Sequence, residues 1–376
     1  MEKNNKTLNV PNLRFPEFSG EWDNGTLQSV ATLSKGTGIS KDQLSEEGQP
    51  CILYGELYTK YRSEIIDTII SKTDIDPKKL VTSQSNDVII PCSGESAVDI
   101  ATARCVKQSN ILLGGDLNII RLKGEHDGSF FAYQLNGRRK YDIAKVAQGV
   151  SVVHLYGEHL KGVKVNYPSA AEQKKISSLL ALIDQRIETQ KKIIEDLKKL
   201  KDAICISQLK SHYETEYMIG DLCKPIAAKQ YIYADITAAG AYPIIQQGEN
   251  PIAGYTESMP FMDYKDVILF GDHTLSIYRP KAPFLLSTDG IKILKPNDMV
   301  NRDYLYYLIY TFMPEPEGYK RYYSILKDIW VPVPNISTQK SIVGKLLSID
   351  SKIEIEARML ELQFQQKQYL LASMFI

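Results

Sequence analysis

The sequence has few cysteines, and their spacing excludes several classes of small protein. The chain contains five of them, Cys51, Cys92, Cys105, Cys205 and Cys223. The number is odd, and no two of them stand at the Cys-x-x-Cys spacing of zinc ribbons and redox motifs. The pattern therefore predicts free thiols in a reducing compartment rather than a disulfide framework or a zinc site.

Long apolar runs and an excess of one charge are also missing. No run of about 18 apolar residues is present, which excludes a predicted transmembrane helix. Met1–Lys6 leads into no apolar segment, so we expect no signal peptide and a cytoplasmic location. Lys and Arg together number 45, as do Asp and Glu. No overall positive charge therefore points to nucleic acid, although a local basic patch stays compatible with it.

Recognisable catalytic motifs are missing as well. There is no Gly-x-x-x-x-Gly-Lys-Ser/Thr phosphate loop and no glycine-rich strand–helix turn for a dinucleotide or a methyl donor. Asn250–Ile252 lacks the second proline and the aromatic residue of an amino-methyltransferase loop. Asp272–Thr274 suits acid–base chemistry, but an isolated pair after a strand is more typical of binding or capping. We therefore expect no catalytic residues, no metal site and no cofactor in this chain.

A segment from the middle of the chain returns near its end. The first copy runs from Pro168 to Glu188 and the second from Pro334 to Glu354. A constant offset of 166 residues superposes them without a gap, with Gln, Lys, Ile, Leu and Asp at matching places. A repeat of this length indicates two copies of one structural unit.

Each copy of the repeat begins a long helical pattern. Residues 171–210 contain neither glycine nor proline, and residues 337–376 contain one glycine, Gly344, and no proline. Ser169 and Glu172 form a capping-box pattern at the start of the first helix. A helix of 40 residues is roughly 60 Å long.

Apolar residues recur at the a and d positions of a heptad along both predicted helices. One polar residue interrupts each seam, Gln190 in the first helix and Glu356 in the second, and the two occupy the same a position of the repeat. A polar residue at an a position fixes the register of a coiled coil. The narrow seam predicts that the helices pair with each other as an antiparallel coiled coil. The alternative is that each helix folds back on its own globule, and the seam becomes irregular after Glu356. The predicted seam comprises Ile176, Leu180, Ile183, Ile187, Gln190, Ile194, Leu197, Ile342, Leu346, Ile349, Ile353, Glu356 and Leu360.

The two segments that precede the helices have the pattern of α/β globules with short strands. Asp266–Phe270 repeats the pattern of Asp87–Pro91, and an aromatic helical run at Tyr304–Tyr310 lies where Phe130–Tyr133 lies in the first globule. We therefore predict an α+β fold with an internal pseudo-two-fold repeat. Its parts are a globule over residues 1–167, a long helix over 168–212, a second globule over 213–333 and a second long helix over 334–376.

Both globules carry basic, amide and aromatic residues in predicted loops. Arg and Lys neutralise phosphates, and Arg, Gln and Asn also contact base edges in the major groove. Each residue alone is equally typical of a solvated surface, but the repetition in two globules favours DNA binding. The first set is Lys35, Tyr58, Lys60, Arg62, Ser93, Arg138, Arg139, Lys140, Gln148 and Ser151; the second set is Gln246, Gln247, His273, Thr274, Arg279, Lys320, Arg321 and Tyr322.

The order of these parts resembles the specificity subunit of type I restriction–modification systems. The most specific match is the Pro-x-x-x-Glu/Thr-Gln-Lys-x-Ile opening of each helix, at Pro168 and Pro334. Leu13–Phe18, followed by Trp22, looks like the family's lead-in to the first target-recognition domain. The resemblance implies two such domains that read the two halves of a split double-stranded DNA site. It also implies two methyltransferase subunits that bind S-adenosylmethionine, ATP-driven restriction subunits, and no chemistry in this chain.

Two functions of other classes remain open at this point. The chain is alternatively a self-contained DNA methyltransferase or nuclease, against which the missing motifs argue. The second possibility is a coiled-coil scaffold protein, and that function leaves the two elaborate globules unexplained.

Overall fold

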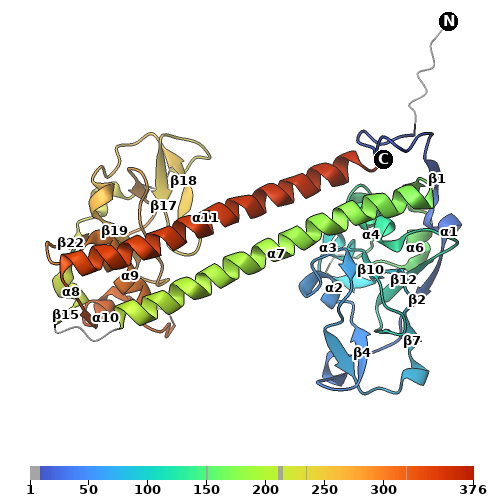
Figure 1. Cartoon of the computed structure of the whole chain (residues 1–376), viewed down its shortest axis with the longest axis horizontal. Helices are drawn as coiled ribbons and strands as arrows, with labels where there is room; N and C mark the ends of the chain where they lie inside the picture. Colours follow the sequence, from blue (N-terminus) through green and yellow to red (C-terminus); the bar gives the residue numbers. More distant parts are fainter. Residues whose placement is uncertain (1–8, 150, 211–214, 234, 319) are drawn as a thin grey trace, which may run out of the picture. The chain divides into compact units, whose positions relative to one another are not determined.

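The chain divides into two compact units, each of which includes a piece of both long helices. The computed structural model describes residues 9–149, 151–210, 215–233, 235–318 and 320–376, so the first residues, where we predicted no signal peptide, lie outside them. Unit 1 is Met1–Lys191 with Met359–Ile376, and unit 2 is Lys192–Arg358. Figure 1 shows both units coloured along the sequence.

Over the described residues, unit 1 is built on two mixed five-stranded sheets. The strands of these sheets have two to six residues, and β8 (Asp87–Pro91), in the centre of the first sheet, is buried along its whole length. The first sheet has the order β2 (Ala31–Lys35), β12 (Leu117–Leu122), β8 (Asp87–Pro91), β10 (Arg104–Val106) and β5 (Ile65–Ile66). The second has the order β3 (Leu44–Ser45), β6 (Ser71–Thr73), β4 (Gln49–Ile52), β11 (Leu112–Leu113) and β7 (Val81–Thr82). Two ladders join β1 (Asp23–Thr26) to β14 (Lys164–Tyr167) and β9 (Ser93–Gly94) to β13 (Val153–His154).

The central helix of unit 1 is α4 (Gly128–Asn136), which Asp127 caps through its side chain. Phe130, Phe131 and Tyr133 are fully buried on it, so α4 joins the sheet to the long helices in one core. This helix confirms the aromatic helical run expected from the sequence. The shorter helices are α1 (Leu27–Val30), η1 (Lys41–Gln43), α2 (Glu56–Thr59), η2 (Pro77–Lys79), α3 (Ala97–Ile100), α5 (Lys140–Lys145) and α6 (Gly157–Lys161).

Unit 2 repeats the plan of unit 1 with shorter sheets. Its described strands form the orders β16 (Cys223–Ile226), β22 (Ile291–Pro296), β19 (Ile268–Gly271), β20 (Ile277–Tyr278) and β18 (Ile252–Thr256), β17 (Tyr242–Ile245), β21 (Leu285–Leu286). A separate ladder joins β15 (Glu216–Met218) to β23 (Trp330–Pro332). The helices are α8 (Ile219–Leu222), η3 (Lys229–Tyr231), η4 (Tyr264–Asp266), α9 (Arg302–Thr311) and α10 (Tyr323–Leu326). Strands β19 and β22 and helix α9 thus take the places of β8, β12 and α4.

The two long helices are α7 (Ala170–Leu209) and α11 (Ile336–Ser373). In unit 1 the start of α7 shares a core with the end of α11, where Leu180 and Leu370 belong to one buried cluster. In unit 2 the end of α7 shares a core with the start of α11, where Leu209 and Leu346 belong to one cluster. The pairing is antiparallel in each unit, as predicted. Each helix also packs on a globule, so the alternative of folding back was partly right.

The predicted seam is the inward face of both helices. Ile176, Leu180, Ile183, Ile187, Gln190, Ile342, Leu346 and Glu356 are buried, and Ile194, Leu197, Ile349, Ile353 and Leu360 are half-buried. After Glu356, where we expected the seam to become irregular, the helix still buries its d position, which Lys367 occupies. A lysine there breaks the apolar pattern but not the packing, because two carboxylates receive its ammonium group.

Candidate nucleic-acid interface

The glutamine of the repeated motif fastens each long helix to a globule. The Nε2 group of Gln173 donates to the carbonyl of Pro168 at 2.8 Å, and its Oε1 accepts from the backbone N–H of Asp127 at 3.0 Å. Because Asp127 caps α4, the start of α7 sets the position of α4, and the two lie side by side in Figure 1. Gln339 does the same in unit 2, where it accepts at 2.8 Å from Asn301, the cap of α9.

The lead-in segment of the chain binds the same helix start. Arg14 donates from Nε and Nη2 to the carboxylate of Glu172, both at 2.8 Å, and Trp22 donates from Nε1 at 3.3 Å. The predicted capping box is therefore only half formed. The Ser169 hydroxyl accepts from the Glu172 backbone at 3.5 Å, but the Glu172 side chain turns to Arg14 and Trp22 instead of back to Ser169. A bidentate guanidinium pair is the stronger partner for a carboxylate.

In unit 1 three loops meet at the residue that follows β8. The backbone N–H of Cys92 donates to the carbonyl of Asp116 at 2.6 Å, and the Cys92 carbonyl accepts from Leu155 at 2.7 Å. The hydroxyl of Ser93 donates to the Asp116 carboxylate at 3.1 Å. The loops after β8, between β11 and β12 and around β13 are thereby joined at one edge of the unit.

In unit 2 the residue that follows β19 makes the same backbone contacts. The N–H of Asp272 donates to the carbonyl of Gly290 at 2.7 Å, and its carbonyl accepts from Tyr322 at 2.8 Å. Here the carboxylate adds a bond, since its Oδ1 accepts from the Tyr323 N–H at 2.7 Å. The same three-loop junction therefore occurs in both globules, and the residues on it differ.

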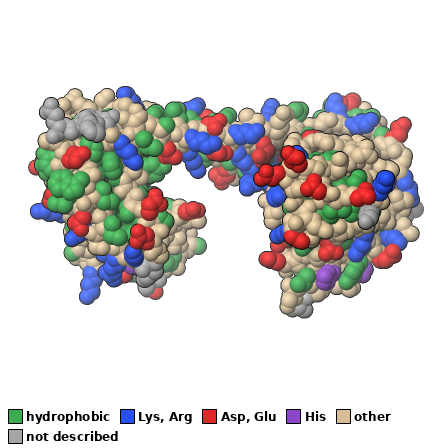
Figure 2. Space-filling model, turned by 90° about the horizontal axis from the view of Figure 1, so that it is seen from below, with side chains coloured by type: hydrophobic (Ala, Val, Ile, Leu, Met, Phe, Trp, Pro, Cys, Tyr) green, Lys and Arg blue, Asp and Glu red, His purple; other side chains and the backbone are tan. Residues whose placement is uncertain are grey.

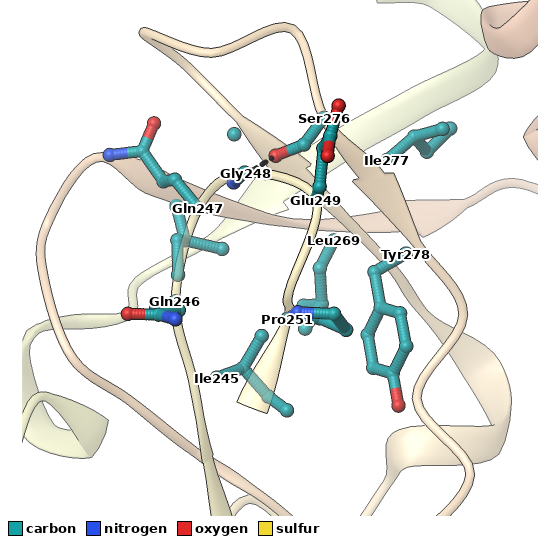
Figure 3. A pocket seen from close by; sticks show the side chains of 12 residues that line it. Ile245, Gln246, Gln247, Gly248, Glu249, Pro251, Leu269, Ser276, Ile277 and Tyr278 are labelled. Carbon is teal, nitrogen blue, oxygen red and sulfur yellow. Dashed lines mark hydrogen bonds between the residues drawn. The ribbon is translucent and has the colours of Figure 1, made fainter. Parts of the chain in front are cut away.

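A small cavity lies under the turn at Gln246–Pro251 in unit 2 (Figure 3). Its volume is about 100 Å³, and Leu269 and Tyr278 form part of its wall. The turn is held by the Gly248 N–H, which donates to the Ser276 hydroxyl at 3.1 Å. Pockets for drug-sized ligands start at about 300 Å³. The cavity is therefore too small for a cofactor, while the amide side chains of the turn lie on the side away from Tyr278 (Figure 3).

Several predicted DNA contacts of unit 1 gather around the three-loop junction. Lys35 lies over the ring of Tyr156 at 5.7 Å, Ser93 pairs with His154 in the β9–β13 ladder, and Gln148 bridges to the same histidine. Tyr58, Gln148 and Ser151 are exposed. Of the turn that we predicted at residues 148–151, Val150 lies outside the described residues.

The other basic residues of unit 1 lie elsewhere. Lys60 is exposed and forms an ion pair with Glu56 at 2.7 Å, and Arg62 is exposed. The turn between α4 and α5 carries Arg138 and Arg139, and Lys140 is the first residue of α5. A Cβ on the neighbouring Gly137 would lie 3.5 Å from Leu371 of α11, so this turn belongs to the helix side of the unit.

In unit 2 the junction brings together Gln247, His273 and Lys320, with Thr274 and Arg321 exposed beside them. Gln246 is half-buried, and its Nε2 donates to the carbonyl of Asn250 at 2.9 Å. Two predicted contacts have structural roles instead. Tyr322 is 1% exposed, and its hydroxyl bonds Glu317 and Gly318. Arg279 pairs with Asp350 of α11 at 2.5 Å.

Three residues at these junctions were not among our predicted contacts. Asp116 has a positive φ of 57°, which places its side chain on the tight turn between β11 and β12. The rings of His154 and Tyr156 stack at 6.0 Å. The recurrence of aromatic residues at 154, 156 and 159 was the signal available in the sequence.

The surface charge is mixed. Figure 2 shows Lys and Arg side chains interspersed with Asp and Glu side chains on the face it presents. All five cysteines are buried free thiols, and burial raises the pKa of Cys51, Cys92 and Cys105 to about 11. Within the described ranges, no group of three or more His, Cys, Asp or Glu is arranged to hold a metal ion. Over the same part of the chain, no helix has the length and apolar content that crossing a membrane requires.

Comparison with known proteins places these features in a family. The chain is 24% identical to the type I restriction enzyme MjaVIII specificity subunit of Methanocaldococcus jannaschii, over 81% of each chain. Its fold matches the crystal structure of a type I restriction–modification S subunit from M. genitalium, with a TM-score of 0.64 and 17% identity over 98% of this chain and 99% of that one.

A second structural match comes from work on complex assembly and conformational transition of the type I restriction–modification system. It has a TM-score of 0.55 and 13% identity over 93% of this chain and 96% of that one. The family model described as "Type I restriction modification DNA specificity domain" matches residues 19–199 and again residues 212–362. The two matches coincide with the two halves of the internal repeat, and the chain belongs to the family of type I restriction–modification specificity subunits.

Proposed function

We propose that the chain recognises a bipartite, asymmetric site on double-stranded DNA, with one globule reading each half-site. The observation that carries this proposal is the three-loop junction, which recurs after β8 and after β19 with the same backbone bonds. A common frame that presents different side chains suits the reading of two different sequences. Each globule is then a target-recognition domain.

The residues at the junctions supply both kinds of contact that such reading needs. Lys35 in unit 1 and Lys320 and Arg321 in unit 2 are exposed cations that suit phosphates. The amides of Gln246 and Gln247 suit base edges in the major groove. Their half-buried positions limit the rotamers they adopt, which favours selective contacts.

We also propose that the chain performs no catalysis and acts in the cytoplasm. Two methyltransferase subunits would bind S-adenosylmethionine and modify the DNA, and restriction subunits would use ATP. The charged outer faces of α7 and α11 suit docking of these partners. Equal numbers of acidic and basic residues predict weak DNA binding by the isolated chain.

The decisive experiment is methylome sequencing of a host that carries this gene with its partner genes. A bipartite motif with two unequal halves is expected, and it should disappear when this gene is deleted. The purified chain alone, incubated with DNA and S-adenosylmethionine, is expected to leave the DNA unmodified. Methylation by the chain alone would instead identify an enzyme, and an unchanged methylome after deletion would leave only the scaffold function.

The length of the long helices is expected to set the gap between the half-sites. Half-site centres one helical turn apart are separated by about 34–36 Å, within the roughly 60 Å of α7. Four residues inserted near Gln190, with a matching insertion in α11, lengthen the helices by about 6 Å. The preferred gap should grow by about two base pairs in a methylation assay. An unchanged gap would show that the helices do not act as a spacer.

Loss of a single phosphate contact is expected to weaken binding of the assembled complex and to reduce its salt dependence. For Arg321→Ala the slope of log K against log salt should fall by roughly one unit. Arg138→Ala applies the same test to the turn after α4, which lies on the helix side of unit 1 rather than at the junction. Fluorescence anisotropy at several salt concentrations measures both quantities. If both variants bind as the wild type does, these basic residues do not contact the backbone.

A further inference from the structure

We infer that Asp272 is a positioning residue for recognition of the second half-site. Its carboxylate holds the segment that carries Lys320 and Arg321 against the turn between β19 and β20. This inference rests on the proposed function and names the residue that orders one of its two reading surfaces.

The surroundings of Asp272 fit that role. The residue is 2% exposed, yet it lies beneath loops whose tips are solvated. Its Oδ1 accepts from the Tyr323 N–H at 2.7 Å, and Lys292 lies 3.5 Å from its Oδ2. Together with its backbone bonds to Gly290 and Tyr322, this fastens three loops to one residue. A hydrogen bond to a buried charged group is among the strong ones in proteins.

The next residue extends the junction to the amide-rich turn. The His273 N–H donates to Oε1 of Gln247 at 3.0 Å, and its ring Nδ1 lies 2.9 Å from the Lys320 carbonyl. Because a carbonyl only accepts, the proton sits on Nδ1 in this contact. A Cβ at Gly290 would lie 2.3 Å from Nε2 of Gln247, so a larger residue there would displace the Gln247 side chain from its present position.

The carboxylate is peculiar to the second domain. In unit 1 the equivalent residue is Cys92, which makes the same two backbone bonds but lacks an acceptor of comparable strength. The corresponding loop there is held by the β9–β13 ladder instead. Removing the carboxylate of Asp272 should therefore disturb reading of one half-site and leave the other intact.

Selective hydrogen bonds to a base need side chains that are already in place before binding. If a loop must be ordered on binding, the entropy lost in ordering it reduces the binding free energy that its contacts provide. A wrong base costs about 1–3 kcal/mol at a well-positioned contact, which corresponds to roughly 5- to 150-fold in rate or affinity. With the Lys320–Arg321 segment released, we expect discrimination at the second half-site to fall by about tenfold or more.

The test uses the complex assembled from the full chain and its methyltransferase partners. Initial methylation rates are measured on duplexes with single-base changes in either half-site of the wild-type motif. Asp272→Ala is expected to accept changes in the second half-site about tenfold better than the wild type, with selectivity at the first half-site unchanged. Asp272→Asn keeps an oxygen for the Tyr323 N–H and should stay within about threefold of the wild type. Asp298→Ala, an exposed acid of the same unit, is the matched control.

His273→Ala is the milder variant in case Asp272→Ala does not assemble. It should relax the same half-site by about threefold, with an unchanged Tm. Unaltered discrimination in an assembled Asp272→Ala complex, or equal losses at both half-sites, would overturn the inference. So would an Asp272→Asn complex that behaves like Asp272→Ala, or an intact His273→Ala complex without effect when Asp272→Ala is insoluble. A wild-type complex that methylates no bipartite motif would instead reject the proposed function.

Discussion

Unit 1 and unit 2 give the equivalent aspartates of the repeat the same tyrosine and lysine partners, but an additional neighbour of opposite charge. In unit 1 Asp184 accepts from the hydroxyl of Tyr133 on α4 at 2.7 Å and from the ammonium group of Lys367 on α11 at 2.6 Å. Lys367 also reaches Glu64 of the globule at 2.6 Å. One ammonium group therefore serves two carboxylates that come from different segments.

In unit 2 the equivalent aspartate, Asp350, accepts from Tyr307 on α9 at 2.7 Å and pairs with Lys201 on α7 at 3.3 Å. Lys201 and Lys367 stand 166 residues apart, so they occupy the same place in the repeat. Here the globule contributes Arg279, whose guanidinium lies 2.5 Å from Asp350 and stacks on Tyr306 at 4.2 Å. The added neighbour is a cation rather than a carboxylate.

The difference shows that equal positions in a repeat need not be equally important. The side chains of Lys367 and Glu64 are 11% and 9% exposed, and those of Lys201 and Asp350 are 13% and 15% exposed. Burial is thus similar, and the charge balance decides. Without Lys367 two buried carboxylates face each other, whereas without Lys201 the aspartate still has Arg279.

Replacement of the two lysines is expected to give the largest contrast between the units. Removal of one partner from a buried ion pair costs about 3–5 kcal/mol, and Lys367→Met should lose that amount. Lys201→Met should lose about 1.5 kcal/mol, as for one hydrogen bond to a charged group. Urea denaturation of the full chain measures both. Equal losses would show that the neighbouring charges do not matter.

A second substitution identifies the cause of the larger loss. Glu64→Gln in the Lys367→Met background removes one of the two carboxylates that have lost their ion-pair partner and should restore about 2 kcal/mol. In the wild-type background Glu64→Gln should be destabilising, because it removes a partner of Lys367. A double-mutant cycle without this change of sign would contradict the charge argument.

The pH dependence of the unfolding free energy should also differ between substitutions in the two units. Burial alone raises the pKa of Glu64, but Lys367 and Arg104 lower it below its ordinary value. In the wild type, Glu64 therefore stabilises the fold above its unfolded pKa, and this contribution is lost as the pH falls through the folded value. Burial and the Glu64 carboxylate raise the pKa of Asp184, so its contribution is largest at low pH and is lost as the pH rises through the folded value.

Without Lys367, both carboxylates are destabilising near neutral pH, and protonation relieves this penalty. The difference in unfolding free energy between the wild type and Lys367→Met should therefore shrink by about 2 kcal/mol on going from about pH 8 to about pH 5. Denaturation curves at several pH values test this. For Lys201→Met the difference should stay nearly constant, since Arg279 remains beside Asp350.

The sequence predicted the parts of the molecule that depend on local periodicity. The helices, their seam and the paired globules follow from a heptad pattern and from a repeat with a constant offset. The lysine at position 367 was read as irregularity in the seam, because its partner Glu64 lies 303 residues away and no local pattern connects them. The loop junctions were equally out of reach, since the ladder that holds the first one consists of strands of two residues.

The glutamines of the repeat are expected to show where the two units are alike. Gln173 and Gln339 are 1% and 0% exposed, and each bonds the capping residue of α4 or α9. Replacement by alanine removes the partner of one backbone N–H and one carbonyl in both cases; these groups are buried in unit 1 and half-buried in unit 2. Each variant should lose about 1–3 kcal/mol, and the two losses should agree within about 0.5 kcal/mol. Lys174→Ala and Lys340→Ala, at exposed neighbouring positions, are the matched controls, and unequal losses at the two glutamines would show that the shared motif holds the two globules differently.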